Sequence, residues 1–251
     1  MYHDENGVGP KKGWNVTTLW YQVRLWCLKI AVFPWTMYYS FLFEELSLRN
    51  IVEDYVLFLH IFVFHTLNMQ GLDDPQVIVD AGAYSGLSTL YFAYQFPDAQ
   101  IIAVEPAPQN FRLLRQHTEH LDKVTCVNKA VWDTKNSITI ADRGVGEWGY
   151  TAHRQTGHNT VEIDTMTMQD VLQMVGGDTV DLLKVDIEGS EKTIFSDGAE
   201  WVKSVDAMIV ETHDFIVDGC EDALWAAIDS REWSVRKQGR DWHLQREETS
   251  S

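Results

Sequence analysis

Five short, mostly apolar runs constrain the fold of this chain more than any other feature of its sequence. These runs are Val77–Val79, Ile101–Val104, Thr125–Val127, Asp181–Val185 and Ala207–Val210. Strands without apolar–polar alternation are typical of a parallel sheet, because both of their faces are buried. Helical stretches separate the runs, and this alternation implies right-handed βαβ crossovers. The sequence therefore predicts an α/β protein with helices on both faces of a mostly parallel sheet.

The remaining elements follow from periodicity and turn residues. The helices expected between and after the runs are Leu87–Phe96, Pro108–His120, Gln169–Val175, Glu191–Phe195 and Asp222–Ser230. Ser137–Ala141 and Thr160–Asp164 alternate apolar and polar residues, which predicts a hairpin or an edge insertion. Two further strands, Trp233–Lys237 and Asp241–Gln245, are joined by a turn at Gly239. With this last pair the predicted sheet has seven strands.

The composition limits the classes of partner. A chain of 251 residues suits one domain, residues 51–251, with an N-terminal addition, residues 1–50. The net charge of −17 argues against nucleic acid, because a groove that follows a phosphate backbone needs a Lys/Arg stripe. Three scattered cysteines without ligand spacing predict neither a disulfide framework nor a cysteine metal site. They fit a reducing, cytoplasmic compartment, and the polar, acidic first residues do not resemble a signal peptide.

The N-terminal addition is rich in aromatic residues, and its role stays open. Helices are expected at Thr17–Phe33 and Thr36–Leu48, and a third at Ile51–Met69 packs on both sides. Within this region the stretch 25–43 has about 19 mostly apolar residues, close to a membrane span in length. Lys29 and Pro34 oppose a span. Three interpretations remain: helices that cover the α/β domain, an interfacial anchor that makes peripheral membrane contact through residues 17–48, or a true span.

Four of the five apolar runs end in an acidic residue. These residues are Asp80, Glu105, Asp186 and Glu211. In an open α/β sheet, ligands bind outside the carboxyl ends of the strands, so the four carboxylates are expected to face one crevice. The turn from Asp80 to Gly86 is built from small residues, which allow a ligand to approach the backbone closely. Its spacing is not GxGxxG, which weakens a dinucleotide site, while Glu105, about 25 residues after Asp80, suits a ribose.

Several segments together resemble one family of enzymes. VIVDAGAYSGLSTLYFA (residues 77–93) resembles motif I of the class I methyltransferases that use S-adenosylmethionine (SAM), and AVEPAPQNFRLL (103–114) resembles the acidic loop that follows it. In order and spacing, VNKAVWD (127–133), DLLKVDIEGSEKTIF (181–195) and IVETHD (209–214) resemble the FkbM family of methyltransferases. The resemblance covers Glu53 to Glu211. It implies a Rossmann-like class I methyltransferase fold and an O-methyltransferase that acts on sugars or natural-product hydroxyls.

The resemblance also assigns residues to the cofactor. Carried over by position, they are Asp80, Gly82, Ala83, Ser85, Gly86, Glu105, Pro106, Ala130, Val131 and Asp186. The first five would hold the methionine end of SAM and its carboxylate, and Glu105 would hold the ribose. Ala130 and Val131 would lie near the adenine, and Asp186 near the sulfonium and the acceptor. The chain departs from the family at Tyr84, where Asn is common, so a polar role at that position is in doubt.

The acceptor side needs a group that removes a proton, since an alcohol is a poor nucleophile. We expect the catalytic residues to be Asp186, Glu211 and His213, with Glu188 as a further candidate base. His213 belongs to the residue type whose pKa suits a base at neutral pH. A Mg²⁺ ion could be held by Asp186 with Glu211 or Asp214, but the sequence does not predict a metal site.

The acceptor itself cannot be read from the sequence. The loop from Asp142 to Asn159 is long, Gly-rich and aromatic, and has the character of a substrate lid. We expect a saccharide or small-molecule hydroxyl as acceptor. The alternatives are a lipid or phenolic acceptor, a membrane-associated binding protein that keeps the fold, and an NAD-type oxidoreductase. The oligomeric state also stays open.

Overall fold

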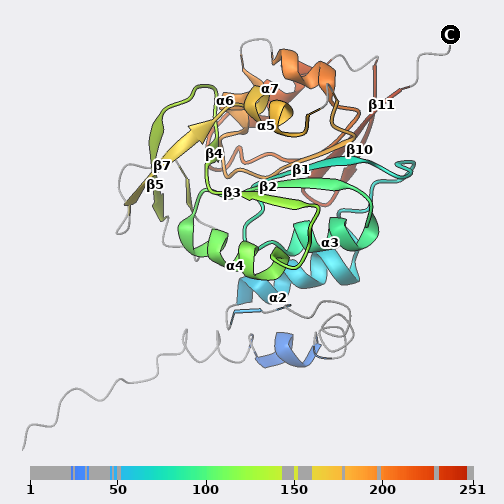
Figure 1. Cartoon of the computed structure of the whole chain (residues 1–251), viewed down its shortest axis with the longest axis vertical. Helices are drawn as coiled ribbons and strands as arrows, with labels where there is room; N and C mark the ends of the chain where they lie inside the picture. Colours follow the sequence, from blue (N-terminus) through green and yellow to red (C-terminus); the bar gives the residue numbers. More distant parts are fainter. Residues whose placement is uncertain are drawn as a thin grey trace, which may run out of the picture.

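The computed structural model describes most of the chain and gives a seven-stranded sheet. It describes residues 24, 26–31, 33, 46, 48–49, 52–142, 150–151, 160–176, 179–196, 199–228 and 232–247, with backbone only at 141–142 and 150–151. The sheet has the order β10-β11-β9-β8-β1-β2-β3 (Figure 1). Its strands are β1 (Val77–Ala81), β2 (Gln100–Val104), β3 (Val124–Val127), β8 (Leu182–Val185), β9 (Ala207–Glu211), β10 (Trp233–Gln238) and β11 (Asp241–Arg246). Strands β3, β2, β1, β8 and β9 are parallel, and the hairpin β10–β11 joins β9 antiparallel. This confirms the predicted fold class.

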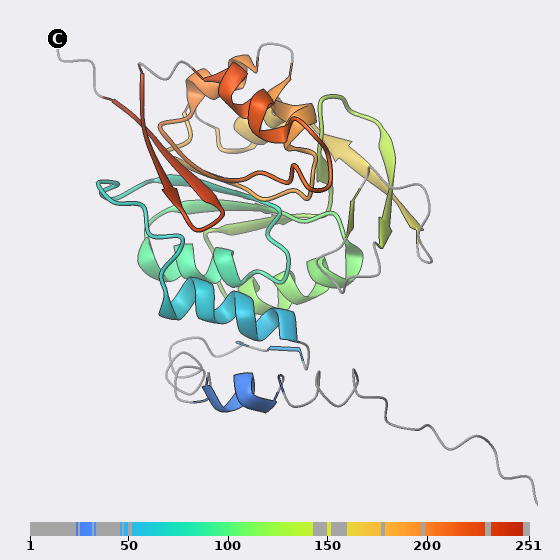
Figure 2. The ribbon, with the colours of Figure 1, turned by 180° about the vertical axis from the view of Figure 1, so that it is seen from behind.

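Helices cover both faces of the sheet, as the uninterrupted apolar strands require. On one side lie α2 (Val52–Phe58), α3 (Leu87–Gln95) and α4 (Pro108–Thr118), and on the other lie α5 (Met168–Met174), α6 (Glu191–Phe195) and α7 (Cys220–Ala227), with the 3₁₀ helix η2 at Glu200–Ser204 (Figures 1 and 2). Along each strand, side chains point alternately to the two faces of the sheet. Ile78 and Leu182 pack in the core beneath α2 and α3, whereas Val79 and Leu183 pack in the core beneath α5 and α7.

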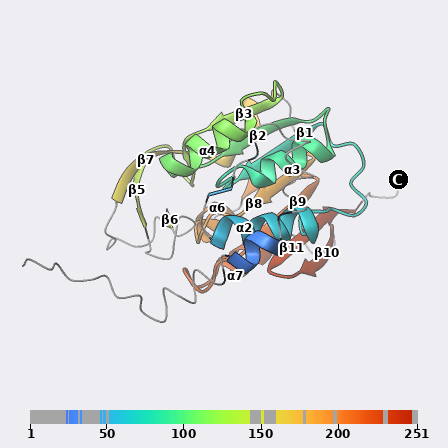
Figure 3. The ribbon, with the colours of Figure 1, turned by 90° about the horizontal axis from the view of Figure 1, so that it is seen from below.

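A second, smaller sheet stands beside the first. Its order is β4-β7-β5-β6, and its strands are β4 (Ala130–Val131), β5 (Ser137–Asp142), β6 (Tyr150–Thr151) and β7 (Thr160–Met166) (Figure 3). The antiparallel pairing of β5 with β7 confirms the predicted hairpin. Ile138 and Ile140 of β5 pack with Ala107 and Ala130, which ties this sheet to the ends of the main strands. Most of the expected lid, residues 143–149 and 152–159, lies outside the described residues.

The region before β1 differs in part from the prediction. Residues 24, 26–31 and 33 are helical, in agreement with part of the expected helix at Thr17–Phe33, but Leu46, Leu48 and Arg49 are not. The helix expected at Ile51–Met69 is instead α2 followed by a π-helix, η1, at Leu59–Val63. It ends early because the bond from the amide of Phe64 to the carbonyl of Leu59 widens the last turn, and His65 has a φ of +52°. No helix among the described residues is long and apolar enough to cross a membrane.

Candidate active site

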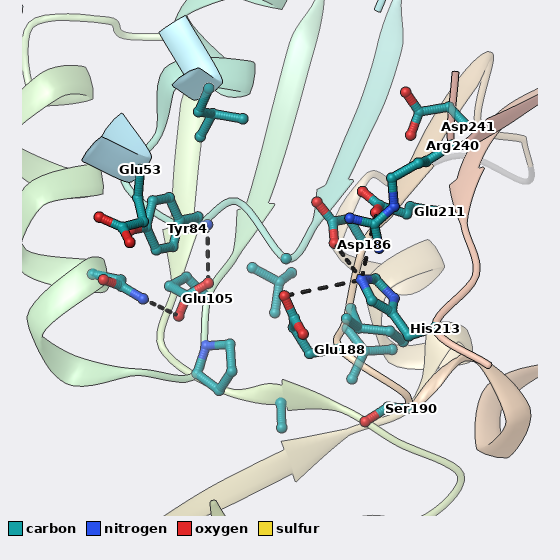
Figure 4. Close-up of a pocket in the computed structure, with 18 of the residues that line it drawn as sticks. Glu53, Tyr84, Glu105, Asp186, Glu188, Ser190, Glu211, His213, Arg240 and Asp241 are labelled. Atoms are coloured by element: carbon teal, nitrogen blue, oxygen red, sulfur yellow. Dashed lines mark hydrogen bonds and ion pairs between the residues drawn. The ribbon is translucent and has the colours of Figure 1, made fainter. Parts of the chain in front are cut away.

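A cavity of about 650 Å³ lies at the carboxyl ends of the parallel strands. The chain leaves β1 for β2 on one side, and β8 lies on the other side, so this is the switch point where open α/β sheets bind ligands. The volume is within the usual range for small-molecule sites. Nine of the predicted site residues line it, namely Gly82, Glu105, Pro106, Ala130, Val131, Asp186, Glu188, Glu211 and His213. The fold therefore brings the predicted cofactor and acceptor residues to one cavity (Figure 4).

The loop after β1 forms the floor of this cavity and depends on Gly82. Gly82 has a φ of +83°, and a Cβ placed on it would lie 1.8 Å from the carbonyl oxygen of Asp186. The amides of Gly82 and Ala83 donate to the carbonyl of Val104, at 2.9 and 3.0 Å. Only glycine allows the loop to pass this close to the end of β8.

Replacing Gly82 by Ala should therefore destabilise the protein strongly, since the new Cβ meets fixed backbone. Gly176 is a matched control, because it also has a positive φ, +64°, but nothing lies within 4 Å of a Cβ there. Gly176→Ala should lower the free energy of unfolding by about 1–2 kcal/mol, the cost of the left-handed backbone alone. Thermal and urea unfolding of both variants measure the difference, and equal losses would contradict the close approach.

Four predicted cofactor residues do not reach the cavity wall, namely Asp80, Ala83, Ser85 and Gly86. Strand β1 continues one residue past Asp80. The fully buried carboxylate of Asp80 accepts hydrogen bonds from Ser88 Oγ and Thr89 Oγ1, at 2.6 and 2.7 Å. The other three are turned toward α4. Ala83 and Gly86 pack on Leu114, and the carbonyl oxygen of Ser85 lies 2.7 Å from His117 Nδ1. These residues shape the loop behind the cavity.

Glu105 is held at one end of the cavity by the backbone around it. Its Oε2 accepts from the amide of Tyr84 at 2.9 Å, and its Oε1 accepts from the amide of Ala107 at 2.8 Å. Asn110 Nδ2 lies 3.5 Å from Oε1, and Asn128 Nδ2 fixes the turn by donating to the carbonyls of Glu105 and Pro106. Burial raises the pKa of Glu105 to about 7, although the two backbone hydrogen bonds lower it. A carboxylate oxygen has two lone pairs. Oε2 can therefore accept one more hydrogen bond from a ligand, whereas Oε1 already has two donors, of which the Asn110 amide at 3.5 Å is the more distant.

Lys184 connects the loop after β1 to Asp186, and no sequence motif indicated this role. Its ammonium donates to the carbonyl of Gly82 at 3.0 Å and lies 3.1 Å from Asp80 Oδ1 and 3.7 Å from Asp186 Oδ2. Burial would lower the pKa of Lys184, but Asp80 and Asp186 raise it above its ordinary value. The signal that could have found it is a single charged residue inside an otherwise buried strand.

His213 lies at the other end of the cavity, surrounded by carboxylates. Its Nδ1 is 2.9 Å from Oε1 of the fully buried Glu191. Its Nε2 is 3.7 Å from Asp186, 3.8 Å from Glu211 and 3.9 Å from Glu188 (Figure 4). Burial would lower the pKa of His213, but the hydrogen bond and charge of Glu191 and the charges of Asp186 and Glu188 raise it to about 9. The expectation of a near-neutral pKa is therefore wrong. With a pKa of about 9, the imidazolium form of His213 predominates at neutral pH, and this form does not accept a proton.

The pKa of Glu211 is close to neutral pH, which suits a residue that accepts a proton there. Burial and the charge of Asp186 raise the pKa of Glu211 to about 7, although His213 and Arg240 lower it. An Arg240 guanidinium nitrogen lies 2.8 Å from Glu211 Oε1, and Asp241 faces Glu211 across the β9–β11 pair. Burial and the charge of Asp186 also raise the pKa of Asp241, to about 6.

A metal ion would have a donor set at this end. One ligand atom each from Asp186, Glu211 and His213 lie within 4.8 Å of one another. However, the chain supplies its own cations to these carboxylates, through Arg240 on Glu211 and Lys184 near Asp186. Protonation of His213 adds a third positive charge. A site without a metal therefore stays our prediction.

Two walls of the cavity come from elements that were not predicted to contribute to the site. Glu53 and His60 come from α2 and η1, Arg240 comes from the turn of the β10–β11 hairpin, and Asp241 is the first residue of β11. These segments are distant in sequence from the recognised motifs and carry no motif of their own. Only the packing of α2 and the antiparallel register of β11 bring them to the cavity.

Comparisons with known proteins find methyltransferases. The family described as the Methyltransferase FkbM domain matches residues 80–233 of the 251. Methyltransferase sdnD of Sordaria araneosa is 24% identical over 226 residues, which cover 76% of this chain and 86% of that protein. The 2-O-methyltransferase NoeI of Sinorhizobium fredii is 24% identical over 143 residues, which cover 51% of this chain and 58% of that protein. The crystal structure of an FkbM methyltransferase from Methylobacillus flagellatus is similar with a TM-score of 0.46 and 15% identity, over 89% of this chain and 62% of that one.

Proposed function

We propose that this chain, which belongs to the FkbM family of methyltransferases, transfers the methyl group of SAM to a hydroxyl group of a sugar, a glycan or a small natural product. The observation that supports this most is the single cavity with Glu105 at one end and the Asp186, Glu211 and His213 cluster at the other. One end offers buried acceptors for a ribose, and the other offers a base for an alcohol. The name of the relative NoeI, a 2-O-methyltransferase, supports methylation at oxygen.

The residues at the Glu105 end fit the nucleoside part of SAM. Glu105 Oε2 can accept a hydrogen bond from one ribose hydroxyl, and the neighbouring hydroxyl can donate to Oε1 beside the long 3.5 Å contact of Asn110. Pro106, Ala130 and Val131 provide an apolar wall beside it, which suits an adenine. Gly82 and Asp186 also line the cavity, and the methionine part would extend over the loop that packs against the end of β8 there. When bound, SAM supplies a methyl group on a positively charged sulfur.

The residues at the other end fit the activation of an alcohol. We assign the proton transfer to Glu211, whose carboxylate would take the proton of the acceptor hydroxyl. Asp186 lies between Glu211 and the loop and would orient the hydroxyl. The His213 imidazolium, held at Nδ1 by Glu191, stabilises the carboxylate form of Glu211. His213 is thus proposed to tune the base.

A mass-spectrometric screen of sugars, phenols and lipids with SAM tests this function. We expect a product 14 mass units heavier than its acceptor, with a demand for a free hydroxyl, and we expect its formation to continue in excess EDTA because the carboxylates have their own cations. Loss of product in EDTA with recovery in Mg²⁺ would show a metal site. Binding of SAM without product from any acceptor class would favour the alternative, a binding protein that keeps the fold.

A peripheral membrane contact through residues 17–48 remains a second proposal for the N-terminal segment. Trp26, Ile30 and Phe33 are exposed and spaced four and three residues apart on helical backbone, so they share one face. An exposed apolar helix face with an aromatic residue is typical of interfacial helices. Flotation of the full chain with lipid vesicles tests this contact, and a lipid acceptor in the screen above would connect it with the reaction.

A further inference from the structure

We propose that Arg49 is a positioning residue of the cofactor site, because it holds both Tyr84 and Asn110, two of the residues that reach the Glu105 carboxylate. The proposal rests on the role of Glu105 given above. Arg49 lies before α2 and outside residues 80–233, the part of the chain that matches the family. Its guanidinium carbon is 4.7 Å from the centre of the Tyr84 ring, and its Nη1 donates to Asn110 Oδ1 at 3.0 Å. One side chain thus contacts two of the groups that surround Glu105.

Arg49 is itself held in a single orientation by Asp54. Asp54 is fully buried in the first turn of α2, and both of its carboxylate oxygens face Arg49. Nε donates to Oδ2 at 3.0 Å, Nη2 donates to Oδ1 at 2.7 Å, and the backbone amide of Arg49 donates to Oδ2 at 2.8 Å. A two-pronged pair of this kind fixes the plane of the guanidinium as well as its position. The third nitrogen, Nη1, is therefore aimed at Asn110.

Tyr84 needs such support because its backbone is strained. Its φ is +52°, a left-handed conformation that an aromatic residue rarely adopts. This conformation directs the Tyr84 amide to Glu105 Oε2 at 2.9 Å. The ring is covered by the Arg49 guanidinium, and the hydroxyl lies 3.5 Å from Asp54 Oδ1. The Arg49–Asp54 pair thus stabilises the conformation that delivers a hydrogen bond to Glu105.

Asn110 receives its orientation from the same side chain. A guanidinium only donates hydrogen bonds, so the amide oxygen of Asn110 must face Arg49. Its Nδ2 then faces Glu105 Oε1 at 3.5 Å. Without Arg49, the amide is free to turn and present its oxygen to Glu105, which would repel the carboxylate. Arg49 therefore acts on both oxygens of Glu105 without contacting either.

The alternative is that the Arg49–Asp54 pair only docks α2 against the domain. The pH dependence of binding separates the two roles. Lys184 is the charged side chain that lowers the pKa of Glu105, and the Tyr84 amide and the Asn110 side chain lower it too. A variant that releases Tyr84 and Asn110 should therefore raise that pKa, whereas a docking role would leave it unchanged.

The test is the binding of S-adenosylhomocysteine to the full chain by calorimetry between pH 6 and 9, together with thermal unfolding. We expect Arg49→Met to weaken binding about tenfold at pH 7 and to move the midpoint of the pH dependence upward. Arg49→Lys keeps the charge but not the planar fork, and should show the same changes to a smaller extent. Arg112→Met is the control, since Arg112 is exposed on α4 near Asn110, and should bind as the unmodified chain does.

A double-mutant cycle with Glu105→Gln completes the experiment. If Arg49 acts through Glu105, Arg49→Met should weaken binding little further when Glu105 is already Gln. Unmodified affinity and pH midpoint in both Arg49 variants, even with a lower melting temperature, would overturn the proposal. Full binding by Glu105→Gln alone would instead overturn the cofactor site on which the proposal rests, so the two failures are distinguishable. Arg49→Lys supplies the result if Arg49→Met does not fold.

Discussion

Replacing Glu105 by Gln is expected to weaken the binding of S-adenosylhomocysteine about a hundredfold, and replacing it by Ala should abolish detectable binding. In Glu105→Ala both hydrogen bonds from the ribose hydroxyls are lost, whereas in Glu105→Gln one is lost. A hydrogen bond to a charged group is worth about 1.5–3 kcal/mol, roughly 10- to 150-fold in affinity. Gln has almost the same size but only one accepting oxygen. Its amide nitrogen would face the amide of either Tyr84 or Ala107, which both donate to Glu105. Calorimetry on the full chain measures the loss.

The same residue predicts how binding depends on pH. Burial raises the pKa of Glu105 from 4.5 to about 7, so the carboxylate form grows as the pH rises through 7. Affinity should therefore increase from pH 6 to pH 8 in the unmodified chain and stay flat in Glu105→Gln. The folded state binds this proton more tightly than the unfolded state. The contribution of Glu105 to stability is therefore fully present below pH 4.5 and is lost as the pH rises toward about 7.

Glu53→Gln is the control for this prediction. Glu53 is another acid in the cavity wall, contributed by α2. If binding depended only on the negative charge of the cavity, both variants would lose affinity alike. We expect Glu53→Gln to bind S-adenosylhomocysteine as the unmodified chain does, and an unchanged affinity in Glu105→Gln would remove the ribose assignment.

The fold was accessible from the sequence because its signals are local. Each parallel strand is a mostly apolar run, and the turn at Gly239, with its φ of +64°, separates β10 from β11 as expected. The ends of helices and strands were predicted less accurately where tertiary contacts determine them. Asp80 reads as the end of a strand, yet β1 continues to Ala81, because Asp80 lies opposite Lys184 in the parallel register and is neutralised there. The π-helix after α2 likewise has no local signature.

From the sequence, the candidate site could be predicted only at residues that belong to recognised motifs. Glu105, Asp186 and Glu211 end their strands, and a parallel sheet places strand ends together, so their meeting could be predicted. The proton affinity of His213 could not, because it depends on Glu191, a helix residue whose buried carboxylate is held by the amides of Ile187 and Gly189. The role of Arg49 could not be predicted for a similar reason, since Arg49 contacts Asn110, which lies 61 residues further along the chain.

Replacing Glu211 by Gln should lower kcat by a factor of about 10²–10⁴, the usual contribution of a general base, while S-adenosylhomocysteine still binds. Glu211 combines a place in the cavity wall with burial that raises its pKa to about 7, so at neutral pH it is partly ionised and can accept a proton. The rate of the unmodified enzyme should rise with pH through this pKa. Steady-state kinetics with the acceptor found by the screen measure both effects.

Two further variants decide whether Glu211 or a neighbour removes the proton. Asp241→Asn removes the carboxylate opposite Glu211 on β11, and should reduce kcat only a few-fold because Asp241 is not the assigned base. His213→Gln removes a positive charge that lowers the pKa of Glu211, so the pH–rate midpoint should move upward. A large loss in Asp241→Asn with a normal rate in Glu211→Gln would transfer the role to Asp241. A normal midpoint in His213→Gln would show that the imidazolium does not tune the base, and would leave its burial against Glu191 as a purely structural pair.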